Sequence, residues 1–199
     1  MNPTRRDRLR DAAVEVLAEA GGRGLTHRAV DSAAGVPLGT AKNYFPSRDA
    51  LLGAVAERCV ERYRTTVEEL AATGPPAGRE GLTALLAGLL ADVAGPGRSR
   101  LLAYLELQAE AARRPWLARL LDPIGASDFP AFEALQRAAG LPVSRERAAV
   151  LTLALHGAIP HLLARGSGTL RASGLENPAA FASGLVAAVY PEDGSPRAG

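Results

Sequence analysis

The pattern of apolar and polar positions at the start of the chain is that of an amphipathic helix. Between Leu9 and Ala20, apolar residues recur every three or four positions, and charged residues occupy positions between them. This is the period of one face of an α-helix, so we predict a helix that ends at the glycine pair Gly21-Gly22. The apolar face consists of Leu9, Ala12, Ala13, Val16, Leu17 and Ala20.

A second helix is predicted from about residue 27 to residue 34. Thr26 can cap it by accepting a hydrogen bond from a backbone N–H group of the first turn. Leu25, which precedes this cap, can pack onto Val30 inside the helix. Gly35 supplies a residue without a Cβ atom at the point where the chain must turn, so the helix is predicted to stop there.

A very short third helix and a long fourth helix are predicted next. The third lies between residues 37 and 44, because a proline is tolerated in the first turn of a helix, and Pro46 ends it. The fourth runs from Ser47, which can cap it, to about residue 72. Asp49 falls in its first turn, where the helix dipole favours a carboxylate.

The rest of the chain also predicts helices. The main break is GPPAG at residues 74–78, and further breaks rich in glycine and proline separate the later helices. The tail at residues 191–199 is predicted to be disordered. Helices are expected at about residues 79–94, 98–113, 115–122, 128–139, 144–165 and 177–190.

Composition agrees with an all-helical fold. Apolar residues make up 47% of the 199 residues, whereas aromatic residues reach only 5%. Alanine, leucine, arginine and glutamate lose little side-chain freedom in a helix, and no alternating run of β-branched residues predicts a strand. We therefore predict an all-α protein, in which the fourth helix joins an N-terminal domain of residues 1–50 to a helical bundle of residues 51–190.

Cysteine usage and apolar stretches predict a soluble, cytoplasmic protein. Cys59 is the only cysteine, which excludes an intrachain disulfide and favours a reducing compartment. The N-terminus lacks the uninterrupted apolar core and cleavage site of a signal peptide. The longest apolar stretches, such as LTALLAGLLADVAG, are too short to span a bilayer, so no membrane partner is expected.

The short third helix gathers polar and aromatic groups that the alanine- and leucine-rich helices lack. It contains Thr40, Lys42, Asn43 and Tyr44, and Lys42 is the only lysine of the chain. The net charge is only +2, but residues 1–48 carry eight basic against five acidic side chains. This local excess of positive charge suits a polyanion, although many solvated segments look alike.

Two short helices joined by a tight turn and supported by an N-terminal helix describe a helix-turn-helix module. Val36 after the turn can hold the second helix against the first. In the major groove of DNA, Lys42 can bond guanine and Asn43 can bond adenine. On spacing alone, a merely solvated polar helix remains the alternative. The side chains better placed for the phosphate backbone are Thr26, Arg28, Tyr44 and Arg48.

The segment GLTHRAVDSAAGVPLGTAKNYFPSRDALL resembles the DNA-binding signature of the TetR family of transcriptional repressors. The resemblance covers residues 5–64 or so and includes the Gly-Val turn, Gly39-Thr40 and Tyr-Phe-Pro-Ser. Two positions depart from the family pattern. Position 42 is frequently an aromatic residue in the family and is Lys42 here, and Pro37 stands where a capping serine is common. The resemblance implies that Thr40, Lys42 and Asn43 face the groove and that Tyr44 and Arg48 contact phosphates. The full set of residues predicted to contact DNA is Thr26, His27, Arg28, Leu38, Gly39, Thr40, Lys42, Asn43, Tyr44 and Arg48.

The same resemblance implies a bundle that binds a small effector and dimerises through its last two long helices. The helices at residues 144–165 and 178–190 are apolar around most of their circumference, and a partner subunit is one way to cover them. The alternative is that both are core helices of a monomer. The expected interface residues are Leu151, Leu155, Ile159, Leu162, Leu185 and Val189.

An effector pocket is expected among bundle residues that offer shape or a polar group, although each can also be explained as ordinary core. The effector is expected to be mainly apolar. His156 and His161 do not share one helix face, so no metal site is expected, and no cofactor is expected either. The candidate pocket residues are Tyr104, Gln108, Trp116, Phe129, Phe132 and His156.

These features predict a homodimeric, sequence-specific DNA-binding regulator, a repressor that a small effector releases from a palindromic operator. An enzyme is the first alternative, but the sequence contains no glycine-rich phosphate loop, nucleophile elbow or cysteine pair. A second alternative keeps the DNA-binding part and makes the bundle a docking site for another polypeptide.

Overall fold

The computed structural model of the chain describes residues 4–164 and 166–191, which form helices and loops with no strand among them. Ten helices follow one another in this part of the chain, which confirms the all-helical prediction. Residues 192–199 of the predicted tail lie outside the described residues. The helices are α1 Arg5–Gly24, α2 His27–Ala34, α3 Thr40–Tyr44, α4 Arg48–Ala72, α5 Gly78–Ala94, α6 Arg98–Ala111, α7 Pro115–Ala138, α8 Arg145–Ala164, α9 Ser167–Ala172 and α10 Pro178–Val189.

The helices form two compact units. The first unit takes in residues up to 70 together with 97–125, and the second takes in 71–96 together with the chain from 126 onward. The sequence analysis divided the chain once, after residue 50, whereas each compact unit consists of two separate segments of the chain. Residues 97–125 belong with the N-terminal helices because α6 packs against α1.

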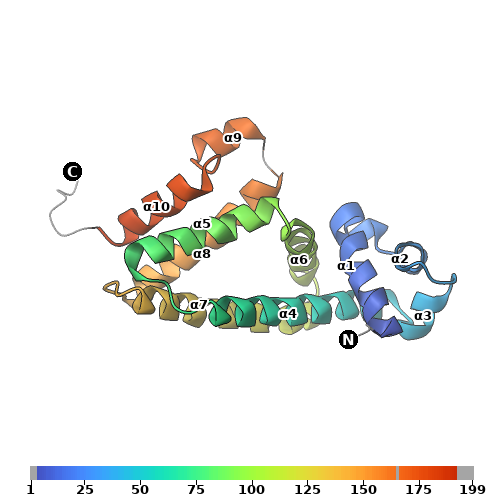
Figure 1. Cartoon of the computed structure of the whole chain (residues 1–199). Coiled ribbons are helices and arrows are strands. Elements are labelled where there is room, and N and C mark those ends of the chain that lie inside the picture. Colours follow the sequence, from blue (N-terminus) through green and yellow to red (C-terminus); the bar gives the residue numbers. More distant parts are fainter. Residues whose placement is uncertain (1–3, 165, 192–199) are drawn as a thin grey trace. The chain divides into compact units, whose positions relative to one another are not determined.

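The first unit is built around α1, which packs against α2 and α6, while α2 packs against α3 (Figure 1). Its core consists of apolar side chains from α1 to α4, joined by α6 and the start of α7. At Gly21 the backbone leaves the helical conformation, with φ 64° and ψ −177°, where the sequence predicted the helix to end. The largest fully buried side chains of this core include Leu9, Leu17, Leu25, Phe45, Leu52 and Leu117.

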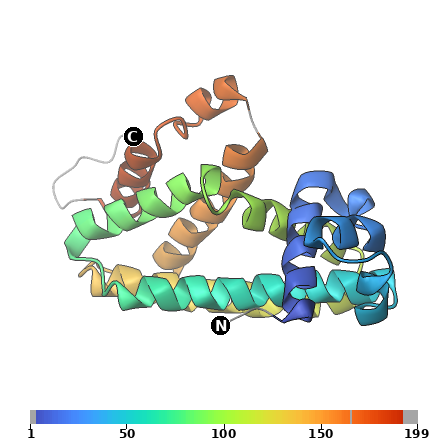
Figure 2. The same ribbon diagram turned by 45° about the vertical axis from the view of Figure 1, so that its right-hand side comes forward.

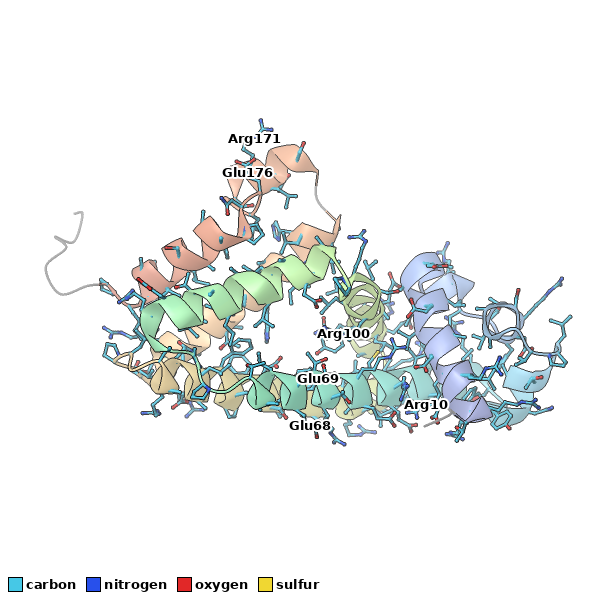
Figure 3. All side chains as sticks on the ribbon, in the orientation of Figure 1. Arg10, Glu68, Glu69, Arg100, Arg171 and Glu176 are labelled. Atoms are coloured by element: carbon cyan, nitrogen blue, oxygen red, sulfur yellow. The ribbon has the colours of Figure 1, made fainter. Side chains whose placement is uncertain are left out.

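A network of ion pairs fastens α1 to α4. Arg10 is almost fully buried, and its Nη2 lies 2.6 Å from Oε1 of Glu61 (Figure 3). Asp11 accepts two hydrogen bonds from Arg58, at 2.6 Å and 3.1 Å, and a third from Arg62 at 2.9 Å. The bidentate geometry fixes the register of the two helices as well as their separation.

The second unit is built around α5, which packs against α8 and α10 (Figures 1 and 2). Its apolar core includes Leu82 and Leu86 of α5 and Leu151 of α8. Tyr190 is fully buried in the same core, and its hydroxyl group donates a hydrogen bond of 2.7 Å to Oε1 of Gln136. The short helix α9 follows α8, and near its end Arg171 and Glu176 form an exposed ion pair (Figure 3).

Two proline positions differ from the sequence prediction. The third helix begins at Thr40 and not at residue 37, because the left-handed conformation of Gly39, with φ 90°, separates it from Pro37. The predicted helices at 115–122 and 128–139 are one helix, α7, which continues through Pro123. A proline removes a helical hydrogen bond, and the burial of Leu121 and Ile124, on either side of Pro123, favours continuing the helix despite that loss.

The helix α9 was not predicted. Glycines at 166 and 168 disfavour a helix there on propensity alone. Leu170, however, packs against the core of the second unit, and tertiary contact of this kind overrides weak propensity.

The helix α8 has the length and composition of a membrane-spanning segment, with 20 residues. The sequence prediction that every apolar stretch is too short is therefore wrong for α8. Within its unit α8 packs against α5, α9 and α10, and it buries Leu151, Leu155 and Leu163. Only 33% of its most apolar 18-residue stretch is buried within the described chain, so packing in the core accounts for part of its apolar composition.

Candidate nucleic-acid interface

The helices α2 and α3 are joined by a turn whose backbone bonds are satisfied locally. Thr26 caps α2 by accepting a hydrogen bond of 3.2 Å from the backbone N–H of Ala29, as predicted. Gly35 ends the helix in the left-handed conformation, with φ 62°. The backbone N–H groups of Gly35 and Val36 both donate to the carbonyl oxygen of Asp31, which closes the turn tightly.

The helix α3 is held by its apolar residues and presents its polar ones. Ala41 is fully buried and Phe45, which follows the helix, is 1% exposed, so both lie in the core of the first unit. Lys42, Asn43 and Tyr44 lie between them and are exposed. Lys42, Asn43 and Tyr44 therefore form an outward face, which the buried Ala41 and Phe45 hold in place.

His27 and Arg48, which were predicted to contact DNA, bond the backbone of their own module. A ring nitrogen of His27, Nε2, lies 2.6 Å from the carbonyl oxygen of Phe45 and bonds it when it carries the proton. Arg48 donates to the carbonyl oxygen of Leu25 at 3.0 Å and to that of Gly22. These contacts tie the end of α3 and the start of α4 to the α1–α2 connection.

Asp31 is the residue that the sequence analysis missed. Its side chain is 1% exposed, and Oδ2 accepts a hydrogen bond of 2.7 Å from the backbone N–H of Gly39. Oδ1 accepts a second bond of 2.6 Å from the backbone N–H of Ala41. The signal in the sequence was weak, because Asp31 is the one acidic residue of α2, a helix that also contains His27, Arg28 and Ser32.

Positive charge gathers around the exposed face. Arg28 on α2 and Lys42 on α3 are exposed, and so are Arg5, Arg6 and Arg8 at the start of α1. The guanidinium group of Arg6 lies 5.3 Å from the ring centre of Phe45. Arg8 donates a hydrogen bond of 3.0 Å to the carbonyl oxygen of Ala34. The module thus combines a polar helix face with cations that suit a phosphate backbone.

Exposure also separates the other predicted contact residues. Leu38, in the turn before α3, is 70% exposed, an unusual environment for a leucine. Gly39 and Thr26 are exposed, whereas Thr40 is half-buried and its hydroxyl group donates 2.5 Å to the carbonyl oxygen of Pro37. His27 and Thr40 are therefore the half-buried members of the predicted set. The exposed members are Thr26, Arg28, Leu38, Gly39, Lys42, Asn43, Tyr44 and Arg48.

The six predicted pocket residues fall into both units. Tyr104 and Gln108 line an open hollow of about 360 Å³ in the first unit, together with Leu121 and Asp122. Trp116 packs on the core of the same unit. The second unit contains Phe129, Phe132 and His156; the ring centres of Phe129 and His156 lie 6.0 Å apart, and Nε2 of His156 lies 3.1 Å from Oδ2 of Asp128.

The predicted dimer residues are mostly covered within the chain itself. Leu151 and Leu155 are buried in the core of the second unit. Ile159 is half-buried, as are Leu162, Leu185 and Val189, and the last three pack against the same core. The large apolar side chains exposed on α8 are instead Val150 and Leu153, at 56% and 58%.

Comparison with known proteins identifies the family. Residues 9–55 match the family model described as bacterial regulatory proteins, tetR family. Residues 77–191 match the model of the tetracyclin repressor-like C-terminal domain, which covers more than half of the chain. The chain belongs to the TetR family. TetR-family proteins are DNA-binding transcriptional regulators and not enzymes, so the helix-turn-helix interpretation of α2 and α3 is confirmed.

Similar solved structures span nearly the whole chain. The multidrug binding protein EbrR, in complex with imidazole, is 28% identical and has a TM-score of 0.63, covering 98% of this chain and 99% of that chain. A TetR-family member from Streptomyces coelicolor is 26% identical and has a TM-score of 0.67, covering 96% of this chain and 100% of that chain.

A curated relative matches over a shorter stretch. It is an uncharacterized HTH-type transcriptional regulator in the dhlA 5′ region of Xanthobacter autotrophicus, 40% identical over 93 residues. This stretch covers 46% of the present chain and 44% of the relative, less than half of either protein.

Proposed function

We propose that this TetR-family protein is a repressor that binds a palindromic operator as a homodimer and leaves it when a small, mainly apolar effector binds. The observation that carries the proposal is the exposed face of Lys42, Asn43 and Tyr44 on a short helix that buried Ala41, and Phe45 just after it, hold to the core. A regulator of this kind acts in the cytoplasm, where it has access to the chromosome.

In the proposed complex α3 enters the major groove. Lys42 donates to the acceptors of a guanine, and Asn43 pairs with an adenine. Leu38 lies at the leading end of the helix and, being 70% exposed, is suited to contact a thymine methyl group. Tyr44, Arg28 and Thr26 bond phosphates, which sets the register of the module on the duplex without reading the sequence.

The second unit is proposed to hold two chains together. Val150 and Leu153 stand three positions apart on α8, so they share one helix face, and both are more than half exposed. A second copy of α8 and α10 would remove this face from water. Two modules then read two half-sites, because one short helix contacts too few base pairs to be selective alone.

The effector is proposed to be an aromatic compound of the size of a dye. EbrR, at 26–28% identity, is described as a multidrug binding protein and was crystallised with imidazole, malachite green and ethidium. In this chain the hollow beside Tyr104 offers an aromatic ring, the amide of Gln108 and the carboxyl group of Asp122. An effector bound there lowers DNA affinity only if it binds the released conformation more tightly.

A two-step binding experiment tests the proposal. Duplexes are first enriched from a random-sequence pool by the purified full-length protein at physiological salt, and their affinity is then measured with increasing malachite green. We expect a preferred duplex and an affinity that falls as the dye concentration rises. A protein that binds the selected duplex equally well at every dye concentration would rule out this effector class.

A further inference from the structure

We propose that Asp31 is a positioning residue for DNA reading, which fixes the leading end of α3 through the backbone N–H groups of Gly39 and Ala41. The inference rests on the proposed function, because it assumes that α3 is the helix that reads bases. It adds a residue that makes no contact with DNA, since the side chain of Asp31 is buried beneath the exposed face.

The helix α3 needs an outside partner at its first turn. It has only five residues, and a helix of that length is not stable on its own. The first N–H groups of any helix have no partner within the helix, and Gly39 before α3 has no side chain with which to cap it. The carboxyl group of Asp31 takes this place from α2, eight residues before Gly39.

Both oxygens of Asp31 are used, and this determines how α3 is oriented. Oδ2 bonds Gly39 just before the helix and Oδ1 bonds Ala41 within it, at 2.7 Å and 2.6 Å. Two bonds from one planar group to two points of the helix restrain its rotation as well as its position. Lys42 and Asn43 directly follow Ala41, so their direction depends on this restraint.

The carbonyl oxygen of the same residue closes the turn. It accepts the N–H groups of Gly35 and Val36, so the main chain of Asp31 sets the end of α2 while its side chain sets the start of α3. Hydrogen bonds to base edges weaken steeply with misalignment, and selective binding therefore depends on such a support more than phosphate binding does.

An electrostatic role for Asp31 predicts the opposite result on mutation. A carboxylate near a DNA-binding surface repels phosphates, so its replacement by an uncharged residue would strengthen binding to every duplex. A positioning role predicts that Asp31→Asn weakens selective binding, because the amide group offers one acceptor oxygen and turns an NH₂ group toward a backbone N–H. The sign of the change separates the two.

The test compares Asp31→Asn with Glu19→Gln in the full chain. Glu19→Gln removes one negative charge from the exposed face of α1 in the same unit and provides the control for charge. The probes are the duplex selected from a random pool by the wild-type protein and a scrambled duplex. For Asp31→Asn we expect affinity for the selected duplex to fall about tenfold or more. Affinity for the scrambled duplex should change as it does in Glu19→Gln.

Amide hydrogen exchange provides a second measurement that needs no folded variant. Gly39 is exposed and precedes the helix, so without Asp31 its N–H would exchange at nearly the open-chain rate. We expect a protected Gly39 amide in the wild-type protein. An unprotected amide, or a folded Asp31→Asn variant with wild-type selectivity, would overturn the assignment. If the wild-type protein prefers no duplex, the proposed function fails, whatever the exchange result.

Discussion

At the scale of single residues, the candidate interface alternates buried and exposed side chains over a few positions. Ala41 and Phe45 are in the core, while Lys42, Asn43 and Tyr44 between them face solvent. The small side chain of Ala41 lets α3 lie close to its neighbours. The exposed residues can then differ between related proteins without disturbing the fold, and they are the natural determinants of which operator is read.

Lys42 and Tyr44 are expected to respond differently to mutation. Lys42→Ala removes a donor to a base edge and is predicted to relax preference at one base pair by about 1–3 kcal/mol. Tyr44→Phe removes a phosphate contact and is predicted to weaken all duplexes to a similar extent. Binding-site selection with each variant measures the two effects. An equal loss on every sequence for Lys42→Ala would exclude base reading by this residue.

Cys59 is assigned to packing and has no role in binding. It is 2% exposed, and burial raises the pKa of its thiol to about 11. The positive charges of Arg62 and Arg100 act in the other direction and lower this pKa, but burial outweighs them. The thiol is therefore expected to resist a thiol-reactive disulfide reagent at about pH 8 in the native protein and to react fully in denaturant. Absorbance of the released thiolate reports both. Native reaction as fast as that of the denatured chain would contradict the burial of Cys59.

Residue-scale roles were predictable where the chemistry is local. Thr26 caps the helix that follows it directly, and Gly35 turns the chain where the helix ends, so both could be predicted from neighbouring residues. The partners of Asp31 lie eight and ten residues away, and no local pattern distinguishes it from a solvated acidic residue. Phosphate contact by Arg48 stays a prediction, and its bond to the carbonyl oxygen of Leu25 could not be foreseen, because folding alone brings the two together.

At the scale of elements, α1 and α4 are joined by charge as well as by apolar packing. Asp11 is half-buried and Glu61 is exposed, and the loss of water around each carboxyl group would by itself raise its pKa. The hydrogen bonds and charges of Arg58, with Arg62 for Asp11 and Arg10 for Glu61, outweigh burial and lower both pKa values below the ordinary 3.8 and 4.5. The folded state therefore favours the deprotonated form of both carboxyl groups.

The lowered pKa values predict a loss of stability in acid. A carboxyl group with a lower pKa in the folded chain stabilises the fold above its unfolded pKa, and this contribution disappears as pH falls through the folded value. We expect the free energy of unfolding to decline below about pH 4.5. Asp11→Asn should flatten the decline, whereas Glu19→Gln on the exposed face of α1 should leave it unchanged. Urea unfolding across this pH range tests both; an unaltered decline in Asp11→Asn would exclude its ion pairs as a cause.

Element existence was more predictable than element boundaries. Most helices follow from apolar periodicity and from breaks at glycine, but Pro123 did not end α7, because burial of Leu121 and Ile124 favours a continuous helix. In α8 the sequence is apolar on several faces, so periodicity could not separate the face that packs within the chain from the outer one. Leu151 proved buried and its neighbour Val150 exposed.

At the scale of the whole molecule, the proposal requires two copies of the chain. Each chain carries one reading helix, and an operator half-site is short, so selectivity depends on how the second module is presented. The exposed apolar residues of α8 are the feature of the second unit that a partner chain would cover. Dimerisation and operator binding should therefore be lost together.

Charge on the outer face of α8 is expected to produce monomers. The double variant Val150→Arg, Leu153→Arg places two cations where a second copy would pack. Because both side chains are already exposed, the fold should persist. Ala134→Arg, at an exposed position on α7, is the matched control. Sedimentation measures the mass of each protein. If the double variant remains dimeric, the dimer interface does not include this face of α8.

DNA reading by paired copies of α3 can be measured by selection from a random duplex pool with the purified wild-type protein at physiological salt. We expect enrichment of an inverted repeat, with half-site centres about 34 Å apart or at a multiple of that distance. A pool that stays random, from a protein that sediments as a single chain, would exclude such reading.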